Sequence, residues 1–431
     1  MKLRPRSAVG VTGTMRMELR SVLRKIVFAS TCVFLIALYV GLSFRAYFAG
    51  RLAAVPDVPH LQKAINLEPA NAEYHELLGR NLALSGVNLD DAITAYRAAV
   101  QLNPYDARTW LDLAGAYQFA GRISEQAESV EHAVEADPNT PHVAWEAANF
   151  FLLQGDQVKA LRYFSVVMAN DPELLDAALQ LCWRVTGDAD QLVNQVLPPR
   201  PDIYLAFLHL LVAKKDVANA EIVWNHLIAL NREFSPTAMF PYFRLLIATQ
   251  EVTAAETAWQ QAAHVNRSLE PYRSSHQNLV VNGGFEDNIL NGGFDWWYQP
   301  NSHAALSIDT SDFSAGTRSL SINFDGMNAT DAGIFQFIPV KPNTEYEFTA
   351  DYRAEELDTA SGPRFSITDP YSEASYVLTD DILGTNPWRQ AQAEFRTGPN
   401  AKLVLLKIVR QPSDALIRGK LWIDNLKLVE K

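Results

Sequence analysis

The sequence predicts a multidomain protein in which one transmembrane helix precedes an all-α solenoid and an all-β sandwich. Three observations along its 431 residues support this order. An uncharged apolar stretch lies near the N-terminus, prolines recur every 34 residues in the middle, and the hydrophobic period changes from 3.6 to 2 near the end. The length exceeds that of one ordinary core, and 48% hydrophobic with 10% aromatic residues excludes a disordered chain.

The apolar stretch at 26–44 contains 19 residues without a charge. As a helix it would reach about 28 Å, close to the hydrocarbon thickness of about 30 Å. We therefore predict a transmembrane helix over 26–48, after a basic stub at 1–25. A cleaved signal peptide is the competing interpretation; the stretch is long for one, and Arg45 and Arg51 interrupt the small residues of a cleavage site.

The net charge of −12 is unevenly distributed. Residues 1–50 contain eight Lys or Arg and one Glu, a charge of +7, so the rest of the chain carries −19. Seven of those eight basic residues precede the apolar stretch, and the positive-inside rule then keeps the N-terminus in the cytoplasm. We expect a single-pass protein of a bacterial inner membrane, with the later domains periplasmic or external. So acidic a body argues against nucleic acid as a partner.

The middle of the chain contains an internal repeat. Four prolines mark its period, the first interval being 35 residues and the next two 34: Pro69, Pro104, Pro138 and Pro172. A glycine follows each of these prolines before the next unit, as a turn inside a helical hairpin requires: Gly86, Gly121, Gly155 and Gly187. We predict a solenoid over 51–270, with its best repeats at 71–172.

These units resemble the tetratricopeptide repeat. Small and aromatic residues at repeated positions carry the resemblance: Gly79, Ala92, Tyr96 and Ala99, then Trp110, Leu113, Tyr117 and Ala133, then Phe151, Ala160 and Phe164. The resemblance implies a protein partner in a concave groove. Polar residues of the inner helices are candidates for its lining: Glu76, Arg80, Asn81, Asp112, Gln118, Glu146 and Asn149. A solvated face is the alternative interpretation for each of them.

The pattern changes after about residue 275. The preceding link is polar and contains Pro271, and short segments beyond it alternate between apolar and polar residues. In 344–354, for example, Tyr346 and Phe348 alternate with charged neighbours, so one face of that strand is buried and the other is wet. Roughly ten such strands with no helix between them predict a β-sandwich over 276–431.

The ends of this domain carry a more specific pattern. It opens with NGGFED at 282–287, continues with GFDWW at 293–297, and closes with LWIDNLKL at 421–428. This order resembles the jelly-roll carbohydrate-binding modules of the galactose-binding-like superfold. The resemblance implies a glycan ligand and a structural Ca²⁺ held by Glu286 and Asp424, with backbone carbonyls near 311–316 completing the shell. Otherwise Glu286 caps a turn and Asp424 pairs with an arginine.

A sugar-binding surface would need aromatic rings against the apolar faces of the sugar and polar side chains for its hydroxyls. Trp297 and Tyr298 offer adjacent rings, and Trp388 and Arg410 are candidates from later strands. On a strand, Trp297 points away from Trp296 and Tyr298, so one side of this group belongs to the core. Packing inside the sandwich is the alternative for every one of these aromatic residues.

No catalytic motif accompanies these domains. The chain lacks a nucleophile elbow, a HExxH zinc motif, a P-loop and a CxxC pair, which argues against an enzyme. We expect a tetratricopeptide solenoid and a jelly-roll sandwich that act as a membrane-anchored envelope scaffold. The solenoid would bind a protein and the sandwich a glycan, during assembly or export of surface polysaccharide. A purely protein-binding assembly factor is the alternative, and a polysaccharide hydrolase is a third hypothesis.

Overall fold

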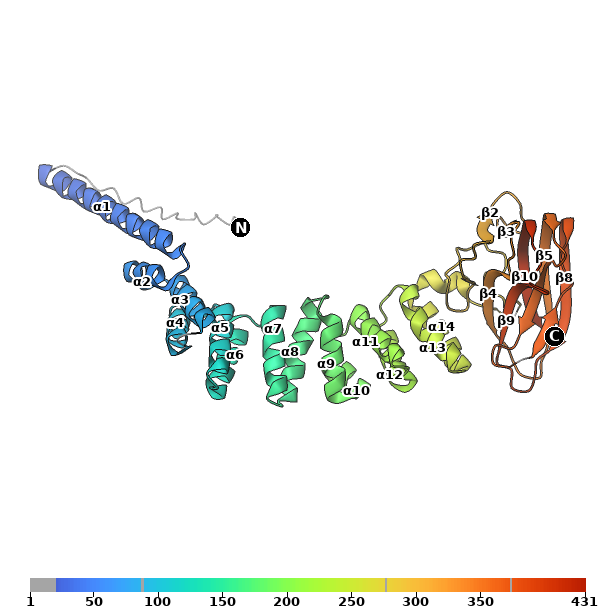
Figure 1. The fold of residues 1–431 in the computed structure, drawn as a ribbon, viewed down its shortest axis with the longest axis horizontal. Helices are drawn as coiled ribbons and strands as arrows, with labels where there is room; N and C mark the ends of the chain where they lie inside the picture. The colour runs from blue at the N-terminus through green and yellow to red at the C-terminus, as the bar shows by residue number, and fades with distance from the viewer. Residues whose placement is uncertain (1–20, 87–88, 276, 373) are drawn as a thin grey trace, which may run out of the picture. The chain divides into compact units, whose positions relative to one another are not determined.

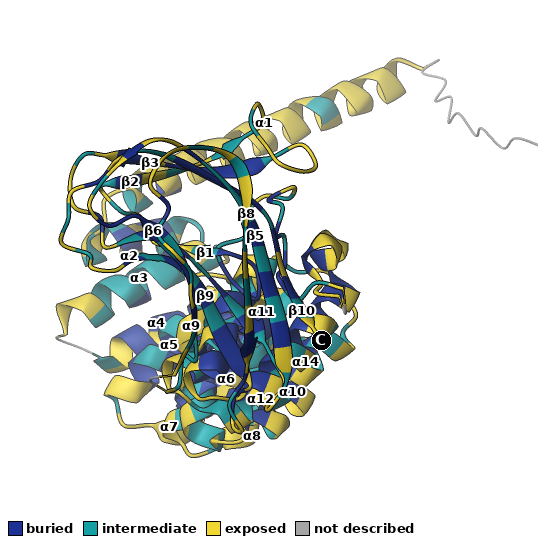
Figure 2. Cartoon of the chain, turned by 90° about the vertical axis from the view of Figure 1, so that its right-hand side faces the viewer, coloured by how far each residue is buried: buried dark blue, intermediate teal, exposed yellow. Residues whose placement is uncertain are grey.

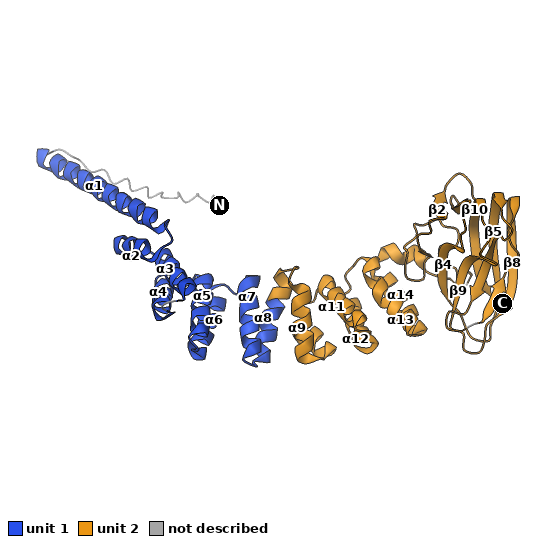
Figure 3. Ribbon diagram, in the orientation of Figure 1, with its two compact units in different colours: residues 1–166 blue, residues 167–431 orange. Residues whose placement is uncertain are grey.

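A computed structural model describes residues 21–86, 89–275, 277–372 and 374–431, with helices in the first part and strands in the last (Figure 1). Most of the predicted basic stub, residues 1–20, therefore lies outside the described residues, as does His276 at the predicted start of the sandwich. The chain divides into two compact units, residues 1–166 and 167–431, which we call unit 1 and unit 2 (Figure 3). The division falls inside the helical region, which is reasonable for a solenoid because each hairpin contacts only its neighbours.

Helix α1 (Val22–Ala53) contains the predicted membrane segment and continues beyond it at both ends. Ser21 caps the helix by accepting a hydrogen bond from the backbone N–H of Arg24. Its side chains are exposed along almost the whole length (Figure 2), and it is long and apolar enough to cross a bilayer. A helix of this kind near the N-terminus serves either as an anchor or as a signal sequence.

Unit 1 builds its helical hairpins from α2 (Val58–Leu67), α3 (Ala72–Ser85), α4 (Leu89–Leu102), α5 (Ala107–Phe119), α6 (Ile123–Ala136), α7 (Pro141–Leu153) and the first part of α8 (Gln157–Asn170). The residues predicted to pack these hairpins are buried, including Ala92, Tyr96 and Ala133. Gly79 shows why a small residue is needed, because a Cβ there would lie 2.8 Å from the ring of Tyr96. Ala49 of α1 packs with α2 and α3, so α1 leads directly into the first hairpin.

The helices of unit 2 are α9 (Leu175–Thr186), α10 (Ala189–Gln195), α11 (Pro201–Ala213), α12 (Val217–Ala229), α13 (Phe240–Ala248) and α14 (Val252–Val265), with 3-10 turns η1 (Pro236–Met239) and η2 (Arg267–Tyr272). The hairpin pattern is less regular here, but small and aromatic residues are again buried between the helices: Ala220, Trp224, Ala255 and Trp259. Gly187 follows α9 in the left-handed conformation, as the turn glycines of unit 1 do after the first helix of their hairpins.

The sandwich of unit 2 contains β1 (Trp297–Tyr298), β2 (Ala304–Asp309), β3 (Ser319–Asp325), β4 (Asp331–Pro339), β5 (Glu345–Asp358), β6 (Pro363–Thr368), β7 (Ser375–Leu378), β8 (Gly384–Arg396), β9 (Leu403–Arg410) and β10 (Arg418–Glu430). The strands form two antiparallel sheets, β1-β4-β9-β6-β7 and β2-β3-β10-β5-β8. Tyr346, Phe348 and Ala350 of β5 lie in the core between the sheets, as their alternation predicts. The predicted β-sandwich is therefore confirmed.

The last helical hairpin packs against the loop that opens the sandwich. Phe294 is 4% exposed, and its ring centroid lies 4.6 Å from that of Phe243 on α13 and 6.1 Å from that of Trp259 on α14. A Cβ on Gly293, which has a φ of +65°, would come within 1.9 Å of the Trp259 ring. The Tyr371 hydroxyl also donates a 2.7 Å hydrogen bond to the carbonyl of Ile247. The predicted polar link is thus followed by a packed junction.

Candidate functional site

The outward surface of the sheet β2-β3-β10-β5-β8 gathers polar and aromatic side chains. Leu421 and Ile423 of β10 lie in the core, so strand alternation places Lys420 and Trp422 on the opposite surface. Cross-strand pairing aligns their neighbours on β3 and β5 in two rows: Ser321, Trp422 and Arg353, and Asn323, Lys420 and Glu355. We call this surface the polar face: Asn323, Asp351, Arg353, Glu355, Trp388, Gln390, Gln392, Lys420 and Trp422.

Trp422, only 4% exposed, lies beneath two cations of the polar face. The guanidinium of Arg353 and the ammonium of Lys420 both lie over its ring, each 4.8 Å from the centroid. Its indole N–H donates a 2.8 Å hydrogen bond to Asp309 Oδ2. Hydrogen bonds from Ser311 and Trp422 lower the pKa of Asp309 to about 2, so this carboxylate accepts from the indole at any physiological pH.

Trp388 of β8 lies half-buried on the same face. Its indole N–H donates a 3.0 Å hydrogen bond to Asp312, which also forms an ion pair with Arg353. Asp312 belongs to the loop at 310–318, which connects β2 with β3 and reaches the other strands of this sheet. On the next outward position of β8, the amide of Gln390 donates to Asp351 at 3.0 Å. Trp388 is therefore a positioned ring with planar polar neighbours.

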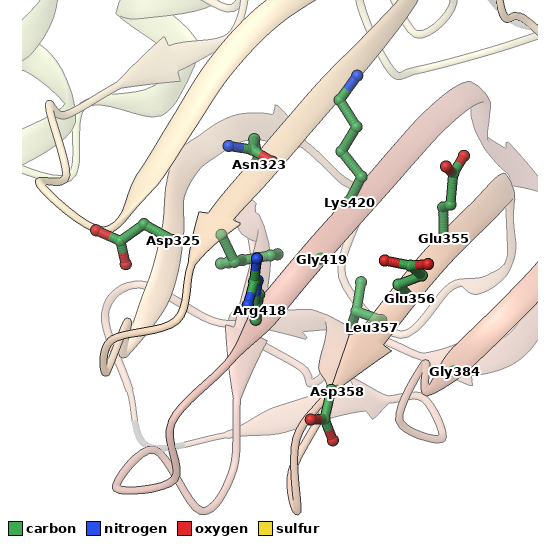
Figure 4. Close-up of a pocket in the computed structure, with 11 residues that line it drawn as sticks. Asn323, Asp325, Glu355, Glu356, Leu357, Asp358, Gly384, Arg418, Gly419 and Lys420 are labelled. Carbon is green, nitrogen blue, oxygen red and sulfur yellow. The ribbon is translucent and has the colours of Figure 1, made fainter.

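A pocket of about 840 Å³ opens at one end of the polar face (Figure 4). Three strands supply most of its polar lining: Asn323 and Asp325 from β3, Arg418 and Lys420 from β10, and Glu355, Glu356 and Asp358 from β5. The pairing of β5 with both β10 and β8 shifts register here, and Glu356 has a φ of +49°. Such a bulge breaks the alternation of side chains, so Glu355 and its neighbour Glu356 both line the pocket.

The structure places Trp297 and Tyr298 away from the polar face, on the edge strand β1 of the other sheet. The Trp297 ring stacks on Phe335 with centroids 6.0 Å apart, and the guanidinium of Arg244 on α13 lies 5.5 Å from its centroid. Trp297 therefore takes part in the junction with the last hairpin. Tyr298 is 42% exposed, but strand order separates it from Trp388. The structure does not bring the predicted aromatic set together.

The structure corrects the prediction that Arg410 belongs to a sugar-binding surface. The residue is only 4% exposed, and its guanidinium donates to the carbonyls of Ala329, Ser361 and Ala415 at 2.6, 2.9 and 2.6 Å. These hydrogen bonds tie together the loops at the end of β9, and its N–H groups are directed to the protein interior. Arg410 is therefore a structural residue, and the prediction that it contacts a glycan is wrong.

Glu286 and Asp424 both bind the loop at 310–318, at the end of the polar face away from the pocket. Asp424 Oδ2 accepts hydrogen bonds of 2.8 Å from the backbone N–H groups of Ser314 and Ala315. Glu286 accepts from the backbone N–H and the hydroxyl of Thr317, both at 2.7 Å. A Cβ on Gly284 would lie 3.6 Å from Asp424 Oδ1 and 3.8 Å from Glu286 Cγ, so this glycine separates the two side chains.

The two carboxylates of this pair have different electrostatic environments. Burial raises the pKa of Asp424. The negative charge of Asp351, the residue of β5 that pairs with Asp424, raises this pKa further. The hydrogen bonds from Thr317 instead lower the pKa of the exposed Glu286. Among the described residues no three His, Cys, Asp or Glu side chains are grouped to hold a metal. A calcium ion here would therefore need backbone oxygens of the 311–316 loop in addition to the two carboxylates.

Sequence reasoning missed most of the polar face. Gln390, Gln392 and Lys420 are outward residues of strands that the alternation predicts, so the signal for their exposure was present. The signal for their proximity was absent, because β3, β10 and β5 are neighbours only through the strand order of the sheet.

Comparison with known proteins supports both domains. Residues 277–415 match the family model of a carbohydrate binding domain, and residues 107–140 match that of the tetratricopeptide repeat. The predicted tetratricopeptide and carbohydrate-module resemblances are therefore confirmed. No curated protein matches the chain.

Solved structures similar to parts of the chain belong to the same two classes. A structure titled "CBM4 structure and function" is 13% identical, covers 35% of this chain and 99% of its own, and has a TM-score of 0.28. A family 16 carbohydrate binding module is 23% identical, with coverages of 36% and 100% and a TM-score of 0.26. The TPR2B domain of yeast Sti1, in a complex with pHsp70, is 21% identical, with coverages of 27% and 96% and a TM-score of 0.24.

Proposed function

We propose that this protein is a non-enzymatic, membrane-anchored scaffold that binds a glycan through the polar face and a protein through its solenoid. The observation that carries the glycan part is the 840 Å³ pocket, which opens on the same sheet surface as the half-exposed ring of Trp388. Helix α1 would anchor the chain in a bacterial inner membrane, with both domains on the periplasmic side. Assembly or export of surface polysaccharide is the process that these two activities would serve.

The side chains of the polar face suit sugar hydroxyls. Amide groups of Asn323, Gln390 and Gln392 offer both a donor and an acceptor, and Lys420 and Glu355 offer charged hydrogen bonds beside them. A half-exposed indole at Trp388 supplies a flat apolar surface for the C–H face of a pyranose ring. Because the surrounding hydrogen bonds hold these groups in place, binding would cost little additional ordering of side chains.

The test of this proposal is retention on polysaccharides. We expect the full chain in detergent micelles to be retarded by at least one polysaccharide in affinity electrophoresis. Replacing Asn323 and Lys420 together with alanine should weaken this binding about tenfold or more, since both side chains line the pocket. Tyr298→Ala is the matched control, because it removes an exposed ring from the other sheet and should leave retention unchanged.

Other outcomes separate the alternatives. Loss of retention in Tyr298→Ala with no effect of the double variant would move the glycan to β1. Complete absence of binding across a broad glycan array would favour the protein-assembly alternative, in which the sandwich binds no sugar. Shortening of a bound polysaccharide over time would instead indicate a hydrolase, with acids such as Glu355 and Asp325 as the first to replace.

We also propose a structural Ca²⁺ held by Glu286 and Asp424. Calcium at 100 times its dissociation constant should stabilise the folded chain by about 2.7 kcal/mol, and a chelator should reverse the gain in melting temperature. Glu286→Gln should abolish this response, whereas Glu394→Gln, which changes an exposed acid on β8, should retain it. A melting temperature that is the same with calcium and with chelator would contradict the proposal.

A further inference from the structure

Three consecutive hairpins of unit 1 expose a large apolar side chain at the end of their first helix. Leu84, Phe119 and Leu153 close α3, α5 and α7, and they are 82%, 85% and 79% exposed. Each lies two residues before the glycine of its hairpin turn, so the repeat puts all three at equivalent positions. Single exposed apolar residues are normal, but a series at equivalent positions of adjacent repeats forms one surface. We call it the apolar row.

Leu153, one residue of the apolar row, also lines a groove of the solenoid. A pocket of about 620 Å³ lies between α5 and α7, and Leu153 contributes to its lining together with Leu111 and Phe150. The same lining contains the polar side chains of Asp112 and Glu146. The groove therefore offers an apolar side and a polar side to one ligand, and its volume suits a few side chains of a bound peptide.

The charge of this groove is negative. Among the described residues that line the pocket, Asp112 and Glu146 are carboxylates, His142 is the other titratable group, and none is Lys or Arg. Two inner-helix cations lie near this groove. Arg80 of α3 is already shared between Glu76 and Asp112, at 2.5 and 3.0 Å. Arg108 lies one turn before Asp112 on α5 and lines the adjoining pocket. An acidic ligand would therefore meet repulsion here, and a basic ligand would find carboxylates to pair with.

We infer that this groove takes a basic, amphipathic segment of a partner protein. Its leucine-like side chains would contact the apolar row and the apolar lining, and its Lys or Arg side chains would pair with Asp112 and Glu146. The inference rests on the proposed protein-binding role of the solenoid and adds the chemistry of the partner. A second copy of this chain fits less well, because the part beyond residue 50 carries a net charge of −19.

The test is a selection of random 12-residue peptides displayed on phage, against the full chain in detergent micelles. Selected peptides should be enriched in Lys or Arg together with Leu, Ile or Phe, and their affinity should fall as salt concentration rises. In titrations of synthetic copies, Phe119→Ala should weaken binding about tenfold, and Glu146→Gln several-fold. Both side chains are exposed, so neither change should affect folding. Val158→Ala, which removes an 81% exposed apolar side chain from α8, should have no effect.

The outcomes distinguish the inference from the function on which it rests. Acidic or neutral peptides whose binding still depends on Phe119 would overturn the basic chemistry and leave the groove as a protein-binding site. Peptides that bind equally well to wild type and to both variants would place the partner elsewhere and overturn the inference. A selection that yields no binding peptide would count against protein binding by this groove altogether.

Discussion

Replacing Phe294 with alanine is expected to uncouple the sandwich from the last helices of unit 2. Its ring lies between Phe243 and Trp259 and is 4% exposed, so truncation leaves a cavity in the junction. Removing a buried phenylalanine typically costs about 3–5 kcal/mol. We expect calorimetry of the full chain to show separate transitions for helices and sandwich at lower temperature, with faster proteolytic cleavage between residues 266 and 278.

Leu416→Ala is the matched control for this prediction. Leu416 is also a large apolar residue of unit 2, but it is 62% exposed and outside the junction, so its removal should change stability by only a few tenths of a kcal/mol. An unchanged thermogram and cleavage pattern for Phe294→Ala would show that the hydrogen bond from Tyr371 and the contact of Arg244 with Trp297 hold the junction without the ring.

Asp295, the next residue, should make the stability of unit 2 depend on pH. The side chain is fully buried; Oδ2 accepts a 2.6 Å hydrogen bond from the N–H of Leu290, and Oδ1 has no hydrogen-bond partner among the described residues. Burial raises the pKa of Asp295 from 3.8 to about 7 despite that hydrogen bond. Asp287 is a further negative group near it and raises the pKa in the same direction.

The direction of the pH effect follows from this raised pKa. Below pH 3.8 the carboxyl is protonated in both the folded and the unfolded state, so it does not lower the free energy of unfolding. Between pH 3.8 and 7 the unfolded chain releases its proton and the folded chain keeps it, so the stability falls as pH rises, by roughly 4 kcal/mol in total. Above pH 7 this penalty is constant. We expect Asp295→Asn to remove this slope and to stabilise the protein at pH 8 by roughly 2–4 kcal/mol, because the amide carries no charge.

Urea unfolding followed by tryptophan fluorescence measures this effect, since Trp259, Trp296 and Trp297 lie near the junction. Asp309→Asn provides a control of opposite sign. The pKa of Asp309 is lowered to about 2, so its charge stabilises the folded state at neutral pH, and the amide should destabilise the protein there. An Asp295→Asn variant less stable than wild type at both pH 4 and pH 8 would contradict a buried, costly charge at this position.

Sequence periodicity was sufficient for the architecture because the signals for it are local or repeated. A proline every 34 residues, a turn glycine in each hairpin and small residues such as Gly79 predict stacked helical pairs without any long-range information. Alternation in 344–354 likewise predicts which side of β5 enters the core. The opening and closing motifs also indicated that Glu286 and Asp424 lie close together, and both hold the same loop in the folded chain, whereas their binding of calcium stays a prediction.

Tertiary structure alone decided which residues share a surface. Trp297 and Trp388 are both aromatic residues on edge strands, yet strand order assigns one to the junction and the other to the polar face. Arginine is a residue type that often binds ligands, but the guanidinium of Arg410 donates its hydrogen bonds to carbonyls of the loops that cover the end of β9. Alternation along a strand predicts which side chains point away from the core. It does not predict which residues of other segments lie next to those side chains or cover them. That depends on contacts between segments far apart in sequence, such as β3, β5 and β10 of the polar face.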